Sequence, residues 1–121
     1  MVEILNILKN DSQLINYIGT AANIYPMETS YTGECILYEY VPLADDKITQ
    51  SNRLLLTIIS NTMAKAIDIE KRVKQLILTK ADTPLTNNIK KVSQNGGGSL
   101  FDSERKKHHR LLYFEIISRS V

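Results

Sequence analysis

The stretch NRLLLTIIS, residues 52–60, decides the predicted fold. Its apolar side chains fall on both faces of an extended backbone, and its β-branched content favours a strand. A strand that is apolar on both faces is typical of the middle of a sheet, where water is excluded from either side. We therefore predict a central strand from Asn52 to Ser60.

The residues before this strand predict its neighbour. In ECILYEYV, residues 34–41, alternation places Ile36, Tyr38 and Tyr40 on one face, as in a mostly buried strand. The segment Pro42–Ser51 has the composition of a polar loop. The two runs therefore predict an antiparallel hairpin.

A helix is predicted directly after the central strand. From Thr62 to Thr79 an apolar stripe recurs at helical spacing, made of Ala66, Ile69, Val73, Leu76 and Ile77. Asn61 or Thr62 is suited to cap its start. Glu70 and Lys74 have the spacing of an i, i+4 ion pair. The stripe predicts a helix that lies on one face of the sheet.

The N-terminal segment also has helical periodicity. Apolar residues recur from Val2 to Ile18, and Gly19 stands where a C-terminal cap is expected. Residues 10–12, Asn-Asp-Ser, interrupt the pattern with side chains suited to an N-cap. One broken helix, or a short turn followed by a helix from Asp11, fits this pattern.

Three further strands are predicted, one before the hairpin and two after the helix. Residues 23–25 form a short strand that Pro26 ends, because proline lacks the amide donor of a sheet ladder. The weak strand Asn88–Gln94 is typical of an exposed edge, where Lys90 and Lys91 discourage pairing with other chains. The last segment, LLYFEIIS at residues 111–118, predicts a strong strand.

The order is thus helix-strand-strand-strand-helix-strand-strand. It indicates the α+β class, with a mainly antiparallel sheet of about four to five strands and two helices packed on it. A chain of 121 residues is about the size of one ordinary domain. We predict a single domain over residues 1–121, with a flexible basic hairpin loop at about residues 95–110.

Composition is that of a globular protein, with 43% hydrophobic and 23% charged residues. No apolar run reaches the roughly 18 residues of a membrane helix. The opening MVEILNILKN carries Glu3 and no basic region, unlike a signal peptide. We therefore expect an intracellular protein without a membrane partner.

Charge is distributed unevenly along the chain, although the net charge is only +2. Residues 1–61 contain three Lys/Arg against seven Asp/Glu, and residues 62–121 contain twelve against six. Such asymmetry fits a nucleic-acid surface, and it equally fits subunits that meet head to tail in a ring.

No residues are predicted to be catalytic, to bind a cofactor or to hold a metal. Gly96, Gly97 and Gly98 lack the Lys and Ser/Thr of a phosphate-binding loop and are followed by a strand. His108 and His109 are adjacent, so a strand points them to opposite faces. Cys35 is the single cysteine, and its apolar surroundings favour a buried thiol.

Residues 105–110, RKKHHR, form a concentrated run of basic side chains. It is able to contact phosphates, and it equally fits a solvated face. No aromatic platform for single-stranded nucleic acid accompanies it. Together with the glycines it forms a candidate interaction loop, whose members are Gly96, Gly97, Gly98, Arg105, Lys106, Lys107 and Arg110.

The pattern as a whole resembles the tail terminator, or tail completion, proteins of long-tailed bacteriophages and prophages. The matching features are DSQLINYIG, NIYPM, CILYEYV, NRLLLTIIS, MAKAIDIEKRVKQLIL and SLFDSERKKHHRLLYFEIISRS. In that family a short strand carries an isoleucine and an aromatic residue, here Ile24 and Tyr25. The last strand is commonly followed by an arginine, here Arg119.

This resemblance implies a non-enzymatic virion assembly protein. Such subunits form a ring, usually hexameric, which caps the tail tube, ends its polymerisation and presents a surface for joining the head. The implied partners are other copies of the chain, the tail tube protein and a head-neck protein, and DNA passes through the ring. The implied location is the host bacterial cytoplasm during assembly and then the virion tail.

Two alternative functions also fit the sequence. A small basic protein could bind nucleic acid through residues 105–110, with an affinity that falls steeply with salt. Another neck component, such as a head-completion or connector protein, belongs to the same assembly class.

Overall fold

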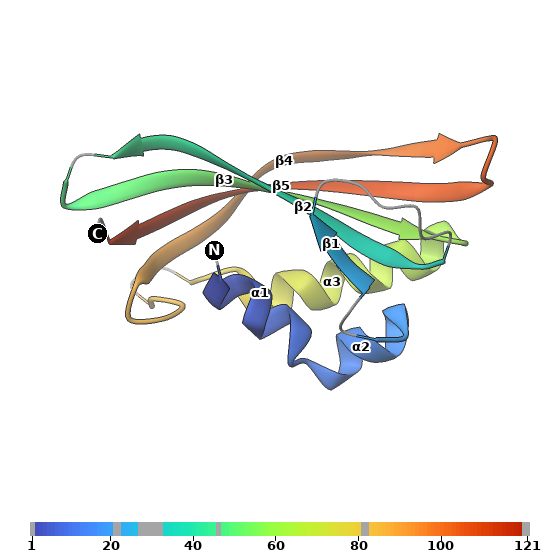
Figure 1. Cartoon of the computed structure of the whole chain (residues 1–121), viewed down its shortest axis with the longest axis horizontal. Coiled ribbons are helices and arrows are strands. Elements are labelled where there is room, and N and C mark those ends of the chain that lie inside the picture. Colours follow the sequence, from blue (N-terminus) through green and yellow to red (C-terminus); the bar gives the residue numbers. More distant parts are fainter. Residues whose placement is uncertain (1, 21–22, 27–32, 46, 81–82, 120–121) are drawn as a thin grey trace.

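The computed structural model describes residues 2–20, 23–26, 33–45, 47–80 and 83–119. Within them, one sheet carries all the helices on a single face (Figure 1). The elements in chain order are α1 (Val2–Lys9), α2 (Ser12–Ile18), β1 (Ile24–Pro26), β2 (Cys35–Asp45), β3 (Thr49–Ser60), α3 (Met63–Ile77), β4 (Ile89–Asp102) and β5 (Lys107–Arg119).

The sheet has five strands in the order β1-β2-β3-β5-β4. Strands β2, β3, β5 and β4 pair antiparallel, and β1 pairs parallel with β2. The α+β class and the central position of β3 agree with the sequence. The sheet is mixed, however, because β1 runs parallel to its neighbour. A strand of three residues has too short a pattern to predict its direction.

The N-terminal segment forms two helices, so the expected pair of helices becomes three and the predicted order changes. Asp11 separates α1 from α2 and caps α2, because its carboxylate accepts the Leu14 amide at 2.9 Å. Gly19 ends α2 with a φ of 90°, a conformation that suits glycine.

Side chains on one face of the sheet form the core with the helices. The fully buried positions of the central strands alternate, as expected for a half-covered sheet, and are Leu54, Leu56, Ile58, Leu112, Phe114 and Ile116. The helices contribute Ile4, Leu8, Leu14, Ile18, Ala66, Ile69, Val73 and Ile77. Burial of each large aliphatic side chain stabilises the fold by about 1.5–3 kcal/mol.

Polar contacts hold α2 against α3. Arg72 donates to both carboxylate oxygens of Asp11, from Nη2 at 2.6 Å and from Nε at 2.9 Å. These hydrogen bonds lower the pKa of Asp11 below its ordinary value. Asp11 therefore caps one helix and binds a second one. At its own start, α3 is capped by Thr62, whose hydroxyl accepts the Lys65 amide at 3.2 Å.

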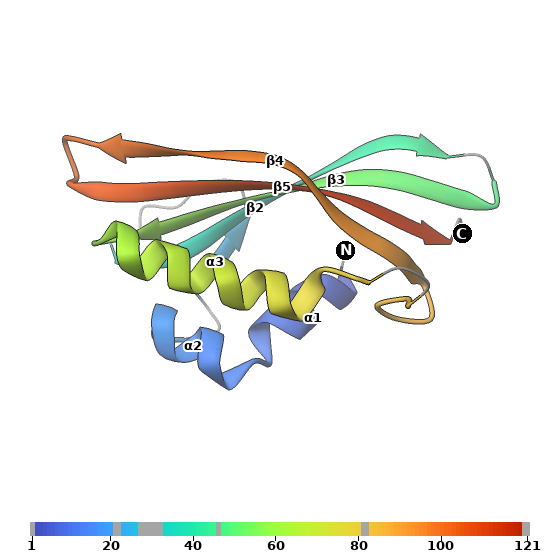
Figure 2. The ribbon, with the colours of Figure 1, turned by 180° about the vertical axis from the view of Figure 1, so that it is seen from behind.

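The two long hairpins are more regular than their sequences predict. The expected loop Pro42–Ser51 shortens, because β2 continues to Asp45 and β3 begins at Thr49. The expected loop at residues 95–110 shortens in the same way, since only residues 103–106 form the turn between β4 and β5. Both hairpins end beyond the helical layer, at opposite ends of the sheet (Figures 1 and 2).

In the part of the chain that the structure describes, no helix has both the length and the apolar character needed to cross a membrane.

Candidate interaction surface

The face of the sheet opposite the helices has no helical layer over it (Figure 2). On this open face Leu55 of β3 pairs with Tyr113 of β5, and Thr57 pairs with Leu111. These side chains are partly exposed. A cavity of about 190 Å³ lies among them, lined by Leu37, Tyr38, Glu39, Leu55, Thr57, Leu111 and Tyr113.

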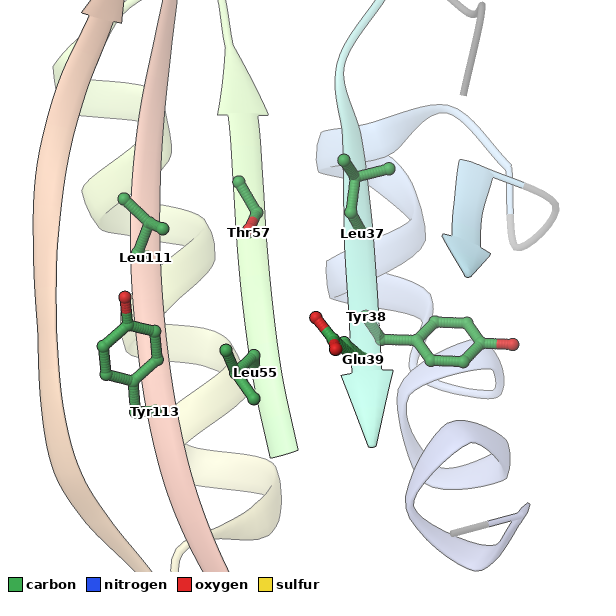
Figure 3. A pocket seen from close by; sticks show the side chains of 7 residues that line it. All are labelled: Leu37, Tyr38, Glu39, Leu55, Thr57, Leu111 and Tyr113. Atoms are coloured by element: carbon green, nitrogen blue, oxygen red, sulfur yellow. The ribbon is translucent and has the colours of Figure 1, made fainter. Parts of the chain in front are cut away.

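Figure 3 shows how three strands supply the lining of this cavity. Leu111 and Tyr113 come from β5, Leu55 and Thr57 from β3, and Leu37 and Glu39 from β2. Tyr38 differs from the others, because its ring points away from β3 towards β1 and packs against the core. The lining thus combines leucine and tyrosine side chains with Thr57 and with the exposed carboxylate of Glu39, which points from β2 towards β3.

The glycine run lies within β4 and not at a hairpin tip. Gly96, Gly97 and Gly98 pair with Tyr113, Leu112 and Leu111, respectively. A register shift between Gln94 and Gly96 marks an irregularity in the strand. The prediction that these glycines belong to a flexible hairpin loop at about residues 95–110 is therefore wrong.

Close packing explains two of the three glycines. A Cβ at position 97 would lie 2.5 Å from the carbonyl oxygen of Leu111, which leaves no room for a side chain. At position 96 the φ is +148°, and a Cβ would lie 3.1 Å from the Tyr113 ring. The glycines thus allow an edge strand to approach β5 and the Tyr113 ring closely.

The basic run does not form one cluster. Arg105 and Lys106 are exposed in the turn, and Lys107 donates from its ammonium group to the side-chain carbonyl of Asn61. Arg110 lies further along β5 and points to the helical side. It donates to Glu70 at 2.5 Å and to Ser99 at 2.6 Å.

Glu70 is the partner of Arg110, and the sequence did not predict this contact. It is only 5% exposed on the inner side of α3, where it accepts from Lys74 at 2.6 Å and from Arg110 at 2.5 Å. Burial opposes its ionisation, but the two hydrogen bonds outweigh burial and lower the pKa of Glu70. Glu70 lies beside Ala66, Ile69 and Val73 on the buried stripe of α3, and this position in the helical pattern indicates that its carboxylate is buried.

The histidines occupy different environments near the β4–β5 turn. The ring of His108 lies 4.8 Å from that of Phe101, measured between centroids. Burial lowers the pKa of His109. Among the described residues, no group of three or more His, Cys, Asp or Glu side chains is placed to hold a metal ion. Cys35 is buried, and burial raises the pKa of its thiol to about 11.

Lys90 and Lys91 lie on β4, which forms an edge of the sheet. Both are exposed, and a register shift between Ile89 and Lys91 leaves Lys90 outside the pairing with β5. Charged side chains and irregular pairing are two features that hinder the addition of a stray strand to an edge.

Exposed large hydrophobic side chains gather at the two hairpin tips, a feature that sequence reasoning also missed. We define the β2–β3 tip as residues 43–45 and 47–49, and the β4–β5 tip as residues 100–107. Leu43 and Ile48 belong to the first, and Leu100 and Phe101 to the second. Such side chains are candidates for contacts with other proteins.

These features define an α+β domain with one covered sheet face, one open sheet face and two protruding hairpins. The structure is similar to a chain from "Virion of native gene transfer agent (GTA) particle", with a TM-score of 0.72 and 13% sequence identity. The similarity covers 97% of this chain and 92% of that chain, so the two share a fold. No protein-family model matches this chain, and no curated protein matches it in sequence.

Proposed function

We propose that this chain is a structural protein of a phage-type virion, and that it acts by binding other virion proteins and copies of itself. One observation carries this proposal: nearly the whole chain shares its fold with a component of a gene transfer agent virion. The coverage is high in both directions, so the likeness extends over the whole domain.

The surface supports a role in protein contacts. The open face offers partly exposed leucine and tyrosine side chains around a cavity, with Thr57 and the Glu39 carboxylate among them. The hairpin tips add four more exposed hydrophobic side chains. Protein interfaces combine apolar side chains with polar groups and are enriched in tyrosine. A neighbouring virion protein that covers the open face would remove these side chains from water.

Within this class, the proposed position is the end of the tail tube. There the chain would act as a tail terminator, with a ring of subunits, six by the family resemblance, that stops tube growth and receives the head. The proposal includes contacts with the tube protein and with a head-neck protein, and a location in the virion tail after assembly in the bacterial cytoplasm. It needs no enzymatic activity and no cofactor.

The geometry does not favour the nucleic-acid function. Arg110 is held by Glu70 and Ser99, and Lys107 contacts Asn61. Of the four basic residues proposed for the interaction loop, Arg105 and Lys106 are the exposed ones. Two adjacent exposed cations neutralise few phosphates, and affinity for DNA rises with the number neutralised.

Disruption of the gene in the phage or prophage that encodes it tests the proposed position. A tail terminator predicts tails of abnormal length that fail to join heads, as seen by electron microscopy. Tails of normal, fixed length without heads would instead support a head-completion or connector role. Normal tails joined to heads would reject the virion-assembly proposal. Complementation with the intact gene is the control.

A further inference from the structure

The two hairpin tips lie at opposite ends of the molecule, and both project beyond the helices (Figures 1 and 2). The β2–β3 tip joins adjacent strands at one end of the sheet, and the β4–β5 tip joins adjacent strands at the other. Each is an extension of long paired strands, so the sheet itself holds its tip in place.

Each tip presents a pair of exposed large hydrophobic side chains. Ile48 is 75% exposed and Leu43 is 44% exposed at one end, while Phe101 is 52% and Leu100 is 49% exposed at the other. Among the described residues one more large hydrophobic side chain is exposed, Ile67 of α3 at 37%. The exposed apolar side chains are therefore concentrated at the ends of the sheet.

The tips also differ in charge. The β2–β3 tip as defined above contains one aspartate, Asp45, and one lysine, Lys47, so its formal balance is zero. Residues 100–107 contain three basic and two acidic side chains, so their balance is positive. Asp45 at one tip offers a carboxylate to the exposed cations Arg105 and Lys106 at the other, which favours contact between unlike tips. The positive balance of the β4–β5 tip disfavours contact between two such tips.

We propose that the β4–β5 tip of one subunit binds the β2–β3 tip of the next copy of this chain. Leu100 and Phe101 would pack against Leu43 and Ile48, with Arg105 and Lys106 near Asp45. Because the two surfaces are different and lie at opposite ends, the contact is heterologous, and repetition of it gives a ring or a filament. The inference deepens the proposed tail-end function and rests on it for the closure of the ring.

Two hairpin tips form a small contact. Stable interfaces bury roughly 1,200–2,000 Å² in total, and side chains from two turns supply less than this. A single contact is thus expected to be weak, whereas closure of a ring makes the last contact intramolecular and raises its effective concentration. We expect monomers in dilute solution and assembled subunits at high concentration or on a tail tube.

Cysteine cross-linking tests the arrangement, because an unlike contact has a distinctive signature. The variants are Ile48→Cys, Phe101→Cys and the double variant with both changes, and each is oxidised in concentrated solution and in assembled particles. Cys35 is left in place, since its buried thiol is poorly reactive. Ile67→Cys serves as the control for an exposed cysteine away from both tips.

The inference predicts that each single variant remains uncross-linked, that the mixture of Ile48→Cys and Phe101→Cys gives dimers, and that the double variant gives a ladder of oligomers. Ile67→Cys mixed with either variant should give no dimer. Self-cross-linking of one single variant as efficient as that of the mixture would overturn the inference. Absence of cross-links in both concentrated solution and assembled particles would overturn it as well.

Charge reversal supplies a second test on the same mixture. Arg105→Glu with Lys106→Glu, introduced into the Phe101→Cys chain, should lower the dimer yield about twofold to fivefold, the range of exposed ion pairs. Asp45→Lys in the partner chain should restore it. The matched control is Lys71→Glu with Lys80→Glu, which changes two exposed lysines elsewhere. An equal effect of the control pair would contradict a role for these charges.

The cross-linking experiment and the gene disruption test different claims, so one can fail while the other succeeds. Abnormal tails without tip cross-links would leave the tail-end function standing and reject the tip contact. Normal tails with a cross-linked ladder would reject the tail-end function and keep the head-to-tail contact.

Discussion

Arg110 of β5 donates a 2.5 Å hydrogen bond to the carboxylate of Glu70, which lies buried on α3. The pair joins the helical layer to the sheet, and Ser99 of β4 holds the same guanidinium at 2.6 Å. Arg110 therefore connects α3 with both strands of the β4–β5 hairpin. The sequence predicts that Arg110 belongs to a basic interaction loop. In the structure its guanidinium group instead binds Glu70 and Ser99 within the domain.

Removal of this arginine should destabilise the domain. Arg110→Met leaves the buried Glu70 carboxylate with Lys74 alone, so we expect a loss of about 1.5–3 kcal/mol in the free energy of unfolding. Urea denaturation measures the change. Arg105→Met, an exposed change in the same basic run, is the control and should stay within about 0.5 kcal/mol. Equal effects of the two substitutions would contradict the structural role of Arg110.

Acid should weaken the fold through Asp11 and Glu70. Both carboxyls have a pKa below the ordinary values of 3.8 and 4.5 in the folded state, so they release protons more readily than in the unfolded chain. Their stabilising contribution is present above those ordinary values and is lost as the pH falls through the lower folded values. Urea denaturation between about pH 6 and pH 2.5 should show this loss, and Asp11→Asn should make it smaller. An unchanged acid dependence in Asp11→Asn would argue against the Asp11–Arg72 contact.

The neighbouring glycines of β4 should respond differently to the same substitution. Gly97→Ala forces a Cβ to within 2.5 Å of the Leu111 carbonyl, so the strands must move apart, at a cost of about 1–3 kcal/mol. Gly98→Ala meets nothing within 4 Å and should be neutral or slightly stabilising. Thermal unfolding of the two variants compares them directly. Similar melting temperatures would show that β4 lies further from β5.

Deletion of Gly96–Ser99 is a sharper test of the same strand. A mobile loop would tolerate the deletion and leave folding intact. In the structure the deletion removes four paired positions from β4 and takes away Ser99, which Arg110 contacts. We therefore expect a protein that is unfolded or strongly destabilised by circular dichroism. A deletion variant with wild-type stability would restore the interpretation of these residues as a loop.

Polar substitution on the open face should affect assembly more than folding. Leu37→Ser changes a partly exposed side chain that lines the cavity, and the buried core lies on the opposite face. We expect about 1 kcal/mol or less of destabilisation and a marked fall in incorporation into particles. Ile67→Ser on α3 is the matched control. Full incorporation of Leu37→Ser would show that the open face is not a contact surface.

Much of the fold follows from the sequence because it depends on local periodicity. Alternation in β2 and the apolar stripe of α3 specify which face each element buries, and the structure agrees. In β3, which is apolar on both faces in the sequence, only the face towards the helices is fully buried. Of the two alternatives for the N-terminal segment, the structure shows the broken helix, with α1 ending at Lys9 and Asp11 capping α2. Gly19, with its positive φ, matches the position expected for a C-terminal cap.

The roles of Arg110, Glu70 and the glycine run were decided only by tertiary structure. A local pattern specifies charge and flexibility, but it does not specify which distant carboxylate meets an arginine or which carbonyl approaches a glycine. Those outcomes depend on the register of β5 against β4 and on the position of α3 over β5. The sequence by itself therefore determined most of the elements and the buried faces of β2 and α3, because hydrophobic burial is periodic along the chain. Long-range pairing decided that the glycines lie within a strand and that the hairpin tips project at opposite ends of the sheet.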